Sequence, residues 1–282
     1  MWQRIKTAII LVIIVGFALF ASSMPIFVVP LLAVGVLIAA QEWTKLMPKW
    51  RQPAQFILAV LVITMISIAL PWTWVFWWAA SLLIWALATA WVVQYPAKEK
   101  WYGRRLVYMG AVILTAAITA MYGLWQMSPW WLMYVFLLVW CADSGAYFVG
   151  RKFGKRKLAP NVSPNKSIEG LIGGLLTAGV VAIVVGNYLQ LSGAALLLFL
   201  ILSAITVAAS VLGDLFESML KRRAGIKDSG SILPGHGGVL DRIDSLLSAT
   251  PVFAFGFWLL LKAGVFTEVW IMMHLAALRV PF

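Results

Sequence analysis

Long apolar segments alternate with shorter polar ones along almost the whole chain. We interpret nine of them as membrane-spanning helices, because a helix needs about 20 apolar residues to cross the hydrocarbon core of a bilayer. Their predicted bounds are 6–22, 25–45, 54–70, 72–94, 105–127, 130–150, 168–189, 193–216 and 244–265. The pattern therefore predicts an all-α integral membrane protein. We expect a single helical domain over residues 1–282, with N-terminal spans in 1–100 and the chemistry in 101–282.

Composition supports this class. Of the 282 residues, 63% are hydrophobic and only 11% are charged, whereas soluble domains are about half apolar and a quarter charged. The single cysteine excludes a disulfide framework. A signal peptide is an alternative for the first apolar segment, but a second span follows it at once, so we expect the segment to be retained.

The connections between the spans alternate in charge. Short uncharged turns occur at Pro25, Pro71, Pro129 and Gly193, and the intervening connections are longer and basic. All but two of the 22 Lys and Arg residues fall on the basic side. The positive-inside rule therefore predicts a cytoplasmic N-terminus. Topology also explains the net charge of +12, so we expect no nucleic-acid partner.

One segment, residues 218–244, has an unusual density of charge. It combines a cation cluster, carboxylates at Asp228, Asp241 and Asp244, and a glycine-rich turn over residues 235–238. Asp241 and Asp244 are three residues apart and share one face of a helix. A solvated loop would also contain such charges. However, cations, carboxylates and glycines that let the backbone approach a ligand together suit a polyphosphate with its divalent metal.

More acids lie at the predicted cytoplasmic ends of the spans. These residues are Asp143, Glu169, Asp214 and Glu217. Ionisable groups at membrane depth are costly and normally face a cavity or a partner. We expect them to converge with Asp241 and Asp244 on the cytoplasmic side, where the active site would lie. The alternative is that each acid pairs with a nearby Lys or Arg and anchors a helix end.

The basic connection over residues 150–170 ends in a predicted helix start. Ser167 is a candidate N-cap and Glu169 falls in the first turn. A helix N-terminus near Ser, Asn and Lys donors can bind an anion, and here Ser163, Asn165 and Lys166 supply them. Basic loops also bind anionic lipid head groups without specificity, so this signal is weak alone.

The ligand types indicate the metal. Several carboxylates without a Cys/His cluster favour Mg²⁺ over zinc. Two such cations could stabilise the entering and leaving oxygens of phosphoryl or nucleotidyl transfer. His236 is then a phosphate donor or an organiser of its loop rather than a general base. No Walker A loop, GxSxG elbow or HExxH motif is present.

The 218–244 segment resembles the signature of phosphatidate cytidylyltransferases, also called CDP-diacylglycerol synthases. The shared pattern is Ser218-x-x-Lys221-Arg222, Lys227-Asp228, Pro234-x-His236-Gly237-Gly238 and Asp241-Arg242-x-Asp244. The resemblance implies that CTP and phosphatidic acid react to CDP-diacylglycerol and pyrophosphate with Mg²⁺, with one or two cations of which the second could be monovalent.

The resemblance also implies roles for individual residues. Metal ligands would be Asp143, Asp214, Asp241 and Asp244. Catalytic residues would be Asp241, Asp244, Lys221, Arg222, Lys227, Arg242 and His236. Substrate-binding residues would be Ser163, Asn165, Lys166, Ser218, Gly237 and Gly238.

Two other functions stay open: a CTP-dependent lipid kinase, and a cation-coupled transporter. A transporter would place polar residues near the bilayer midplane and show repeat symmetry, whereas the charges here gather at one face. We expect a bacterial inner membrane protein whose partners are CTP, phosphatidic acid and membrane lipid. A homodimer is left open.

Overall fold

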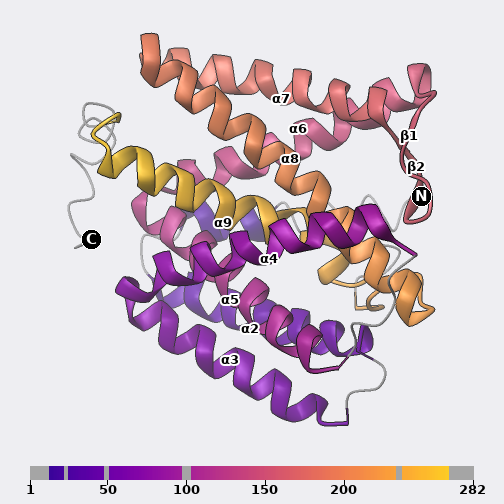
Figure 1. Ribbon diagram of the computed structural model, residues 1–282. Helices are drawn as coiled ribbons and strands as arrows, with labels where there is room; N and C mark the ends of the chain where they lie inside the picture. The colour runs from indigo at the N-terminus through magenta and orange to yellow at the C-terminus, as the bar shows by residue number, and fades with distance from the viewer. Residues whose placement is uncertain (1–12, 22–24, 48–50, 97–102, 233–236, 267–282) are drawn as a thin grey trace.

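A computed structural model describes residues 13–21, 25–47, 51–96, 103–232 and 237–266. The described chain is almost entirely helical (Figure 1). Its elements are η1 (Phe17–Ala21), α2 (Pro25–Lys45), α3 (Pro53–Ala69), η2 (Pro71–Thr73), α4 (Trp74–Gln94), α5 (Arg104–Met127), α6 (Pro129–Phe153), β1 (Lys157–Ala159), β2 (Ser163–Ser167), α7 (Ile168–Tyr188), α8 (Gly193–Ala224) and α9 (Leu240–Lys262). The predicted all-α class is confirmed, apart from one short β-hairpin.

Seven helices in the described ranges are long and apolar enough to cross a membrane. They are α2, α4, α5, α6, α7, α8 and α9. The predicted span 54–70 is a shorter helix, α3, of 17 residues. The predicted span 6–22 lies mostly outside the described residues. The count of nine therefore stays a prediction, while an integral membrane protein with at least these seven candidate spans is supported.

The helices run back and forth between two ends of the bundle (Figure 1). The basic connections and the β-hairpin lie at one end, where α2, α4, α6 and α8 finish and α3, α5, α7 and α9 start. The short turns between α3 and α4, α5 and α6, and α7 and α8 lie at the other end. This arrangement agrees with the alternation of charged and uncharged connections along the sequence.

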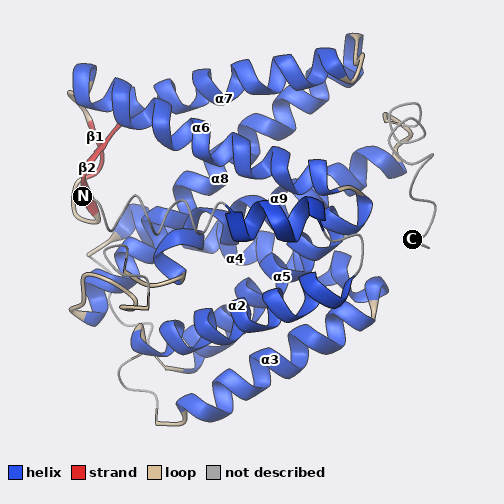
Figure 2. Ribbon diagram, turned by 180° about the vertical axis from the view of Figure 1, so that it is seen from behind, coloured by secondary structure: helices blue, strands red, loops and turns tan. Residues whose placement is uncertain are grey.

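Helix α5 forms the centre of the packing. About 78% of the most apolar stretch of this helix is buried inside the protein, a larger share than in any other candidate span. It contacts α2, α3, α4, α6 and α9. Other helices rather than lipid therefore cover most of its surface. Helices α6 and α7 pack on the side of the bundle opposite α3, with α4 and α9 between (Figures 1 and 2).

Close helix contacts depend on glycines. A Cβ atom at Gly174 of α7 would meet the Ala142 carbonyl oxygen of α6 at 2.7 Å, and one at Gly170 would meet the Ala146 carbonyl oxygen at 2.9 Å. Small residues allow two helices in a membrane to approach to backbone contact. The α6–α7 pair therefore holds the hairpin that follows α6 in a defined place.

The sequence predicts a basic loop over residues 150–170, but part of this segment is a β-hairpin. Lys157–Ala159 and Ser163–Ser167 form an antiparallel hairpin. Ser167 ends the second strand in an extended conformation and its hydroxyl accepts a hydrogen bond from the Gly170 amide at 3.1 Å. The predicted N-cap is thus confirmed, and it fixes the hairpin to the start of α7.

Candidate functional site

An acidic cavity lies at the basic end of the bundle, between α6, α8, α9 and the loop that joins α8 to α9. We use this name for the cavity of about 470 Å³ lined by Val139, Trp140, Asp143, Asp214, Lys221, Asp228, Asp241, Arg242, Asp244, Ser245 and Leu246. Every aspartate in the sequence lines it. Of the glutamates in the described ranges, none does. Of the six acids predicted to converge, the four aspartates line the cavity, whereas Glu169 and Glu217 do not. Asp228, which was not among the six, lines it as well.

The crossing of α8 and α9 brings two of these acids together. Gly213 has no side chain, and a Cβ atom there would collide with the Asp244 carbonyl oxygen of α9. The next residue of α8 is Asp214. Asp214 and Asp244 therefore project from two helices at their point of closest approach. Helix α9 begins at Leu240, four residues before the predicted span, which places Asp241 and Asp244 in its first turns.

Helix α8 extends beyond the predicted span end at residue 216. Its 32 residues make it about 48 Å long, which exceeds the hydrocarbon core by several turns. Gly225 ends it in a left-handed conformation, with φ 71°, where its amide donates to the Arg222 carbonyl. Ser218 and Lys221 therefore lie on a helix. The sequence pattern groups them with the loop in one charged segment.

Lys221 forms the ionic centre of this extension. Its ammonium lies 2.7 Å from the Asp241 carboxylate and contacts the Glu217 carboxylate one turn back along α8. The side chains of Glu217 and Asp241 are only 2% and 5% exposed. Buried charges need partners of this kind. One lysine thus compensates two carboxylates and ties α8 to α9.

Asp241 also organises the loop before α9. Its carboxylate accepts hydrogen bonds from the Ser229 amide at 2.9 Å and the Gly238 amide at 2.8 Å. Gly237 adopts φ 80°, a conformation that favours glycine. The two predicted glycines therefore act on the loop: Gly237 makes its turn, and Gly238 supplies a donor to Asp241.

The hairpin reaches the cavity through one side chain. The Lys166 ammonium of β2 lies 2.6 Å from the Asp214 carboxylate, whose other oxygen accepts a hydrogen bond from Ser218 at 3.2 Å. Lys166 and Ser218 were both predicted as substrate-binding residues, and both contact an aspartate of the cavity. Ser163 and Asn165 were predicted as substrate-binding residues too. They lie on β2 with Lys166 and, like Lys166 and Ser218, are not among the residues that line the cavity.

Glu42 is a further residue of the site that the sequence pattern does not indicate. This residue of α2 is fully buried, and its carboxylate accepts from the Val239 amide at 3.2 Å, the Leu240 amide at 2.7 Å and the Ser229 hydroxyl at 3.4 Å. It therefore caps the N-terminus of α9 and holds both arms of the loop. The available signal was a carboxylate within an apolar span, which is costly unless it has a function. Residues 1–100 thus contribute directly to the site.

Other predicted residues lie apart from the cavity. Arg222 and Lys227 are exposed and do not line it. Glu169 instead pairs at 2.9 Å with Arg156, the residue before β1. For Glu169, the alternative of simple helix-end anchoring is the correct one. His236 lies outside the described residues.

The carboxylates do not form a ready-made metal site. Within the described ranges, no three His, Cys, Asp or Glu side chains are close enough to hold one ion. The reason is visible for two of them, since Asp214 and Asp241 are paired with lysines. In the same part of the chain, Asp143 and Asp244 form no ion pair. Two carboxylates without a paired cation, facing one polar cavity, fit a hard divalent ion such as Mg²⁺.

Lys221 offers a direct test of the ionic centre. Replacing Lys221 with Met is expected to lower the free energy of unfolding by about 3–5 kcal/mol, because two buried carboxylates lose their partner. Thermal unfolding of the purified protein in detergent measures this. Arg222→Met is the matched control, and as an exposed substitution it should change stability by no more than about 0.5 kcal/mol. Equal stability of the two variants would contradict the central place of Lys221.

Comparisons with known proteins show the family of this chain. Residues 2–260 match the model of the cytidylyltransferase family. The chain is 40% identical to a phosphatidate cytidylyltransferase of Haemophilus influenzae over 295 residues, which cover 92% of this chain and 99% of that protein. It is 43% identical to one of Pseudomonas aeruginosa over 264 residues, covering 91% and 96%. A relative from Bacillus subtilis with the same name is 48% identical over 128 residues, covering 44% and 46%.

Proposed function

The chain belongs to the cytidylyltransferase family, and on this premise we propose how its acidic cavity serves the reaction. The protein is a nucleotidyltransferase that converts CTP and phosphatidate to CDP-diacylglycerol. The observation that carries the placement of this reaction is that all five aspartates of the chain line one cavity, together with Lys221 and Arg242. Such a density of charge among apolar spans has a physical purpose if two anionic reactants meet there.

The chemical step needs positioning and charge neutralisation. A phosphate oxygen of phosphatidate forms a bond to the α-phosphorus of CTP, the bond to the bridging α–β oxygen breaks, and pyrophosphate leaves with that electron pair. The lipid phosphate is already ionised at neutral pH, so no dedicated base is required. Lys166 and Arg242 lie where they can neutralise the phosphates of the two reactants.

Lys221 has a different role in this proposal. Its ammonium is held between Glu217 and Asp241, so it is not free to follow a substrate. It keeps α8 and α9 in register and adds a fixed positive charge to the cavity wall. A preorganised charge of this kind stabilises developing negative charge without reorganisation during the reaction.

We further propose that Mg²⁺ binds among Asp143, Asp214, Asp241 and Asp244, with the unpaired Asp143 and Asp244 as its first ligands. When bound, the ion would neutralise phosphate charge and favour departure of pyrophosphate. Asp214 would need to loosen its contact with Lys166 to join them. A substrate phosphate that attracts Lys166 would have this effect, so nucleotide and metal should bind cooperatively. A second cation, divalent or monovalent, stays a prediction.

The basic end of the bundle faces the cytoplasm in this proposal. Its connections hold most of the Lys and Arg residues, and the positive-inside rule places such connections in the cytoplasm. CTP would then reach the acidic cavity from water, while the acyl chains stay in the bilayer. The relatives are bacterial, which supports an inner-membrane location. A homodimer stays a prediction.

The reaction is tested by following label. With purified protein, phosphatidate and CTP labelled at the α-phosphate, we expect label to enter lipid, and chelation of divalent cations to abolish transfer. Added Mg²⁺ should restore it. Label entering lipid only from the γ-phosphate would indicate a lipid kinase and overturn the proposal. Transfer that persists after chelation would remove the metal from it.

A further inference from the structure

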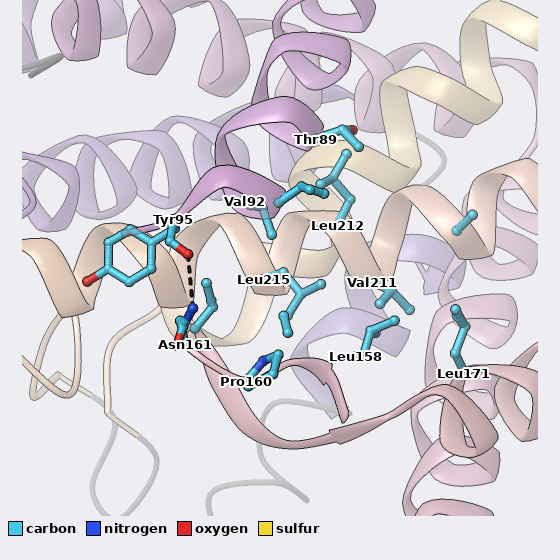
Figure 3. Close-up of a pocket in the computed structure, with 14 residues that line it drawn as sticks. Thr89, Val92, Tyr95, Leu158, Pro160, Asn161, Leu171, Val211, Leu212 and Leu215 are labelled. Atoms are coloured by element: carbon cyan, nitrogen blue, oxygen red, sulfur yellow. Dashed lines mark hydrogen bonds between the residues drawn. The ribbon is translucent and has the colours of Figure 1, made fainter. Parts of the chain in front are cut away.

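A second cavity lies on the other side of α8 from the acidic one. This apolar pocket has a volume of about 320 Å³ and is enclosed by the last turns of α4, the β-hairpin, α7 and α8. Figure 3 shows aliphatic side chains from all four elements around it, among them Val92, Leu158, Leu171 and Leu212. The reaction described so far uses none of them.

The pocket opens toward the surface that the spans present to the bilayer. Val93 of α4 is 78% exposed, and Thr89 of α4 and Ala208 of α8 are also exposed. Both helices are candidate membrane spans. Polar groups gather at the end near the hairpin, where the Asn161 side-chain amide donates to the Tyr95 carbonyl at 3.2 Å (Figure 3). The pocket is thus apolar inside and polar only at its rim.

Helix α8 contributes residues to both the pocket and the acidic cavity, although no residue lines both. Leu215, which lines the pocket, follows Asp214, which lines the cavity, so the two sites flank the same turn of α8. The hairpin that closes the pocket also carries Lys166, the partner of Asp214 at 2.6 Å. A lipid whose phosphate lies beside Lys166 therefore has an apolar pocket lined by the same hairpin and the same helix.

We propose that the apolar pocket holds part of one acyl chain of the lipid substrate. This inference rests on the proposed function, since it assumes that a lipid phosphate reacts in the acidic cavity. An apolar chain attached to a phosphate fits a pocket with an apolar lining, an opening to the bilayer and a wall formed by the same hairpin that carries Lys166. The volume lies at the lower end of the range for small-molecule sites, which suits a segment of one chain rather than two.

The pocket should contribute orientation more than affinity. Lipid tails are about as apolar as leucine, so moving a chain from the bilayer into the pocket gives little hydrophobic free energy. A chain held there would direct the glycerol and its phosphate around α8 toward Asp214. Fixing a reactant in this way raises the rate of the chemical step. The expected signature is therefore a dependence of kcat/KM on chain length.

Ala208→Phe tests the proposal by filling the pocket from α8. Activity is measured with dioleoyl phosphatidate and with dihexanoyl phosphatidate, both in detergent micelles. We expect kcat/KM for the long chain to fall about tenfold, while the value for the short chain stays within about twofold. Ala204→Phe is the matched control, because Ala204 is exposed on the same helix one turn earlier and lines neither cavity. It should leave the ratio between the chains unchanged.

Two results would contradict the acyl-chain site. A parallel loss for both chains, or no change for either, would overturn the acyl-chain site. If the unmodified protein failed with both substrates, the proposed function itself would be wrong. Should Ala208→Phe not fold, the unmodified protein and phosphatidate with a diazirine partway along one chain provide a second test. Labelling of pocket residues such as Leu158 or Leu212 is expected, and labelling confined to the exposed face of α7 would refute the site.

Discussion

Replacing Asp244 with Asn should reduce CTP-dependent conversion of phosphatidate on the order of 100- to 1,000-fold, an effect of the size found when one preorganised electrostatic group is removed. Asp244 lines the acidic cavity at the point where α9 crosses α8, and it forms no ion pair among the described residues. The variant keeps the shape of the side chain and removes its charge. The expected loss of activity follows from the proposed role of Asp244 as a ligand of Mg²⁺. The measurement is transfer of label from the α-phosphate of CTP into lipid.

The matched control for Asp244→Asn is Glu169→Gln. Glu169 also lies at the start of a helix at the basic end, but it pairs with Arg156 and does not line the cavity. An amide oxygen there can still accept hydrogen bonds from the hairpin amides. Activity is expected to stay within about threefold of the unmodified protein. A correctly folded Asp244→Asn variant with undiminished turnover would exclude the metal role of this residue.

Removing the carboxylate of Glu42 should affect both stability and turnover. Glu42→Ala leaves the Val239 and Leu240 amides and the Ser229 hydroxyl without their acceptor. Each buried group left unsatisfied costs about 1–3 kcal/mol, and loss of a helix cap costs a similar amount. We expect a lower unfolding temperature and a fall in kcat of about tenfold or more, because the loop then no longer holds Asp241 in place.

Hydrogen exchange distinguishes a local role of Glu42 from general destabilisation. Amides of residues 229–240 should exchange faster in Glu42→Ala, while those of α5 keep their protection. Thr64→Val serves as the control. Thr64 of α3 is as buried as Glu42, but its hydroxyl bonds to the Thr115 hydroxyl of α5, and neither residue belongs to the loop. This variant should leave exchange in the loop unchanged. Faster exchange throughout the protein in Glu42→Ala would contradict its specific role at the loop.

Hydrophobic patterning predicted much of the architecture correctly. Eight predicted spans correspond to described helices, and seven of these helices are long and apolar enough to cross a membrane. The turns at Pro71, Pro129 and Gly193 fall between helices as expected. Membrane helices are predictable in this way because every backbone polar group must be satisfied within the segment, so long apolar runs have one available structure. Motif resemblance also identified the family, which the comparisons confirm.

The wrong predictions concern polar segments, because a polar segment can form a helix, a strand or a loop. The stretch around Lys221 continues α8 instead of starting a loop, because Gly225 is the first residue that ends the helix. Ser163–Ser167 is a strand because it pairs with β1, and its own residues do not indicate this conformation. Arg222 lies one position from Lys221 and yet is exposed, since adjacent residues of a helix face different directions.

Sequence alone determined the class of the protein, the family and the set of aspartates to consider, because these follow from composition, apolar segment length and motif. Tertiary structure decided which acids line one cavity together and which form an ion pair elsewhere. Asp143 and Asp214 lie far apart along the chain and meet at one cavity, whereas Glu169 meets Arg156 just before the hairpin. Glu42 joined the site only through the packing of α2 against the start of α9. The partners of a buried charge depend on which helices pack against each other, and the local sequence does not determine that packing.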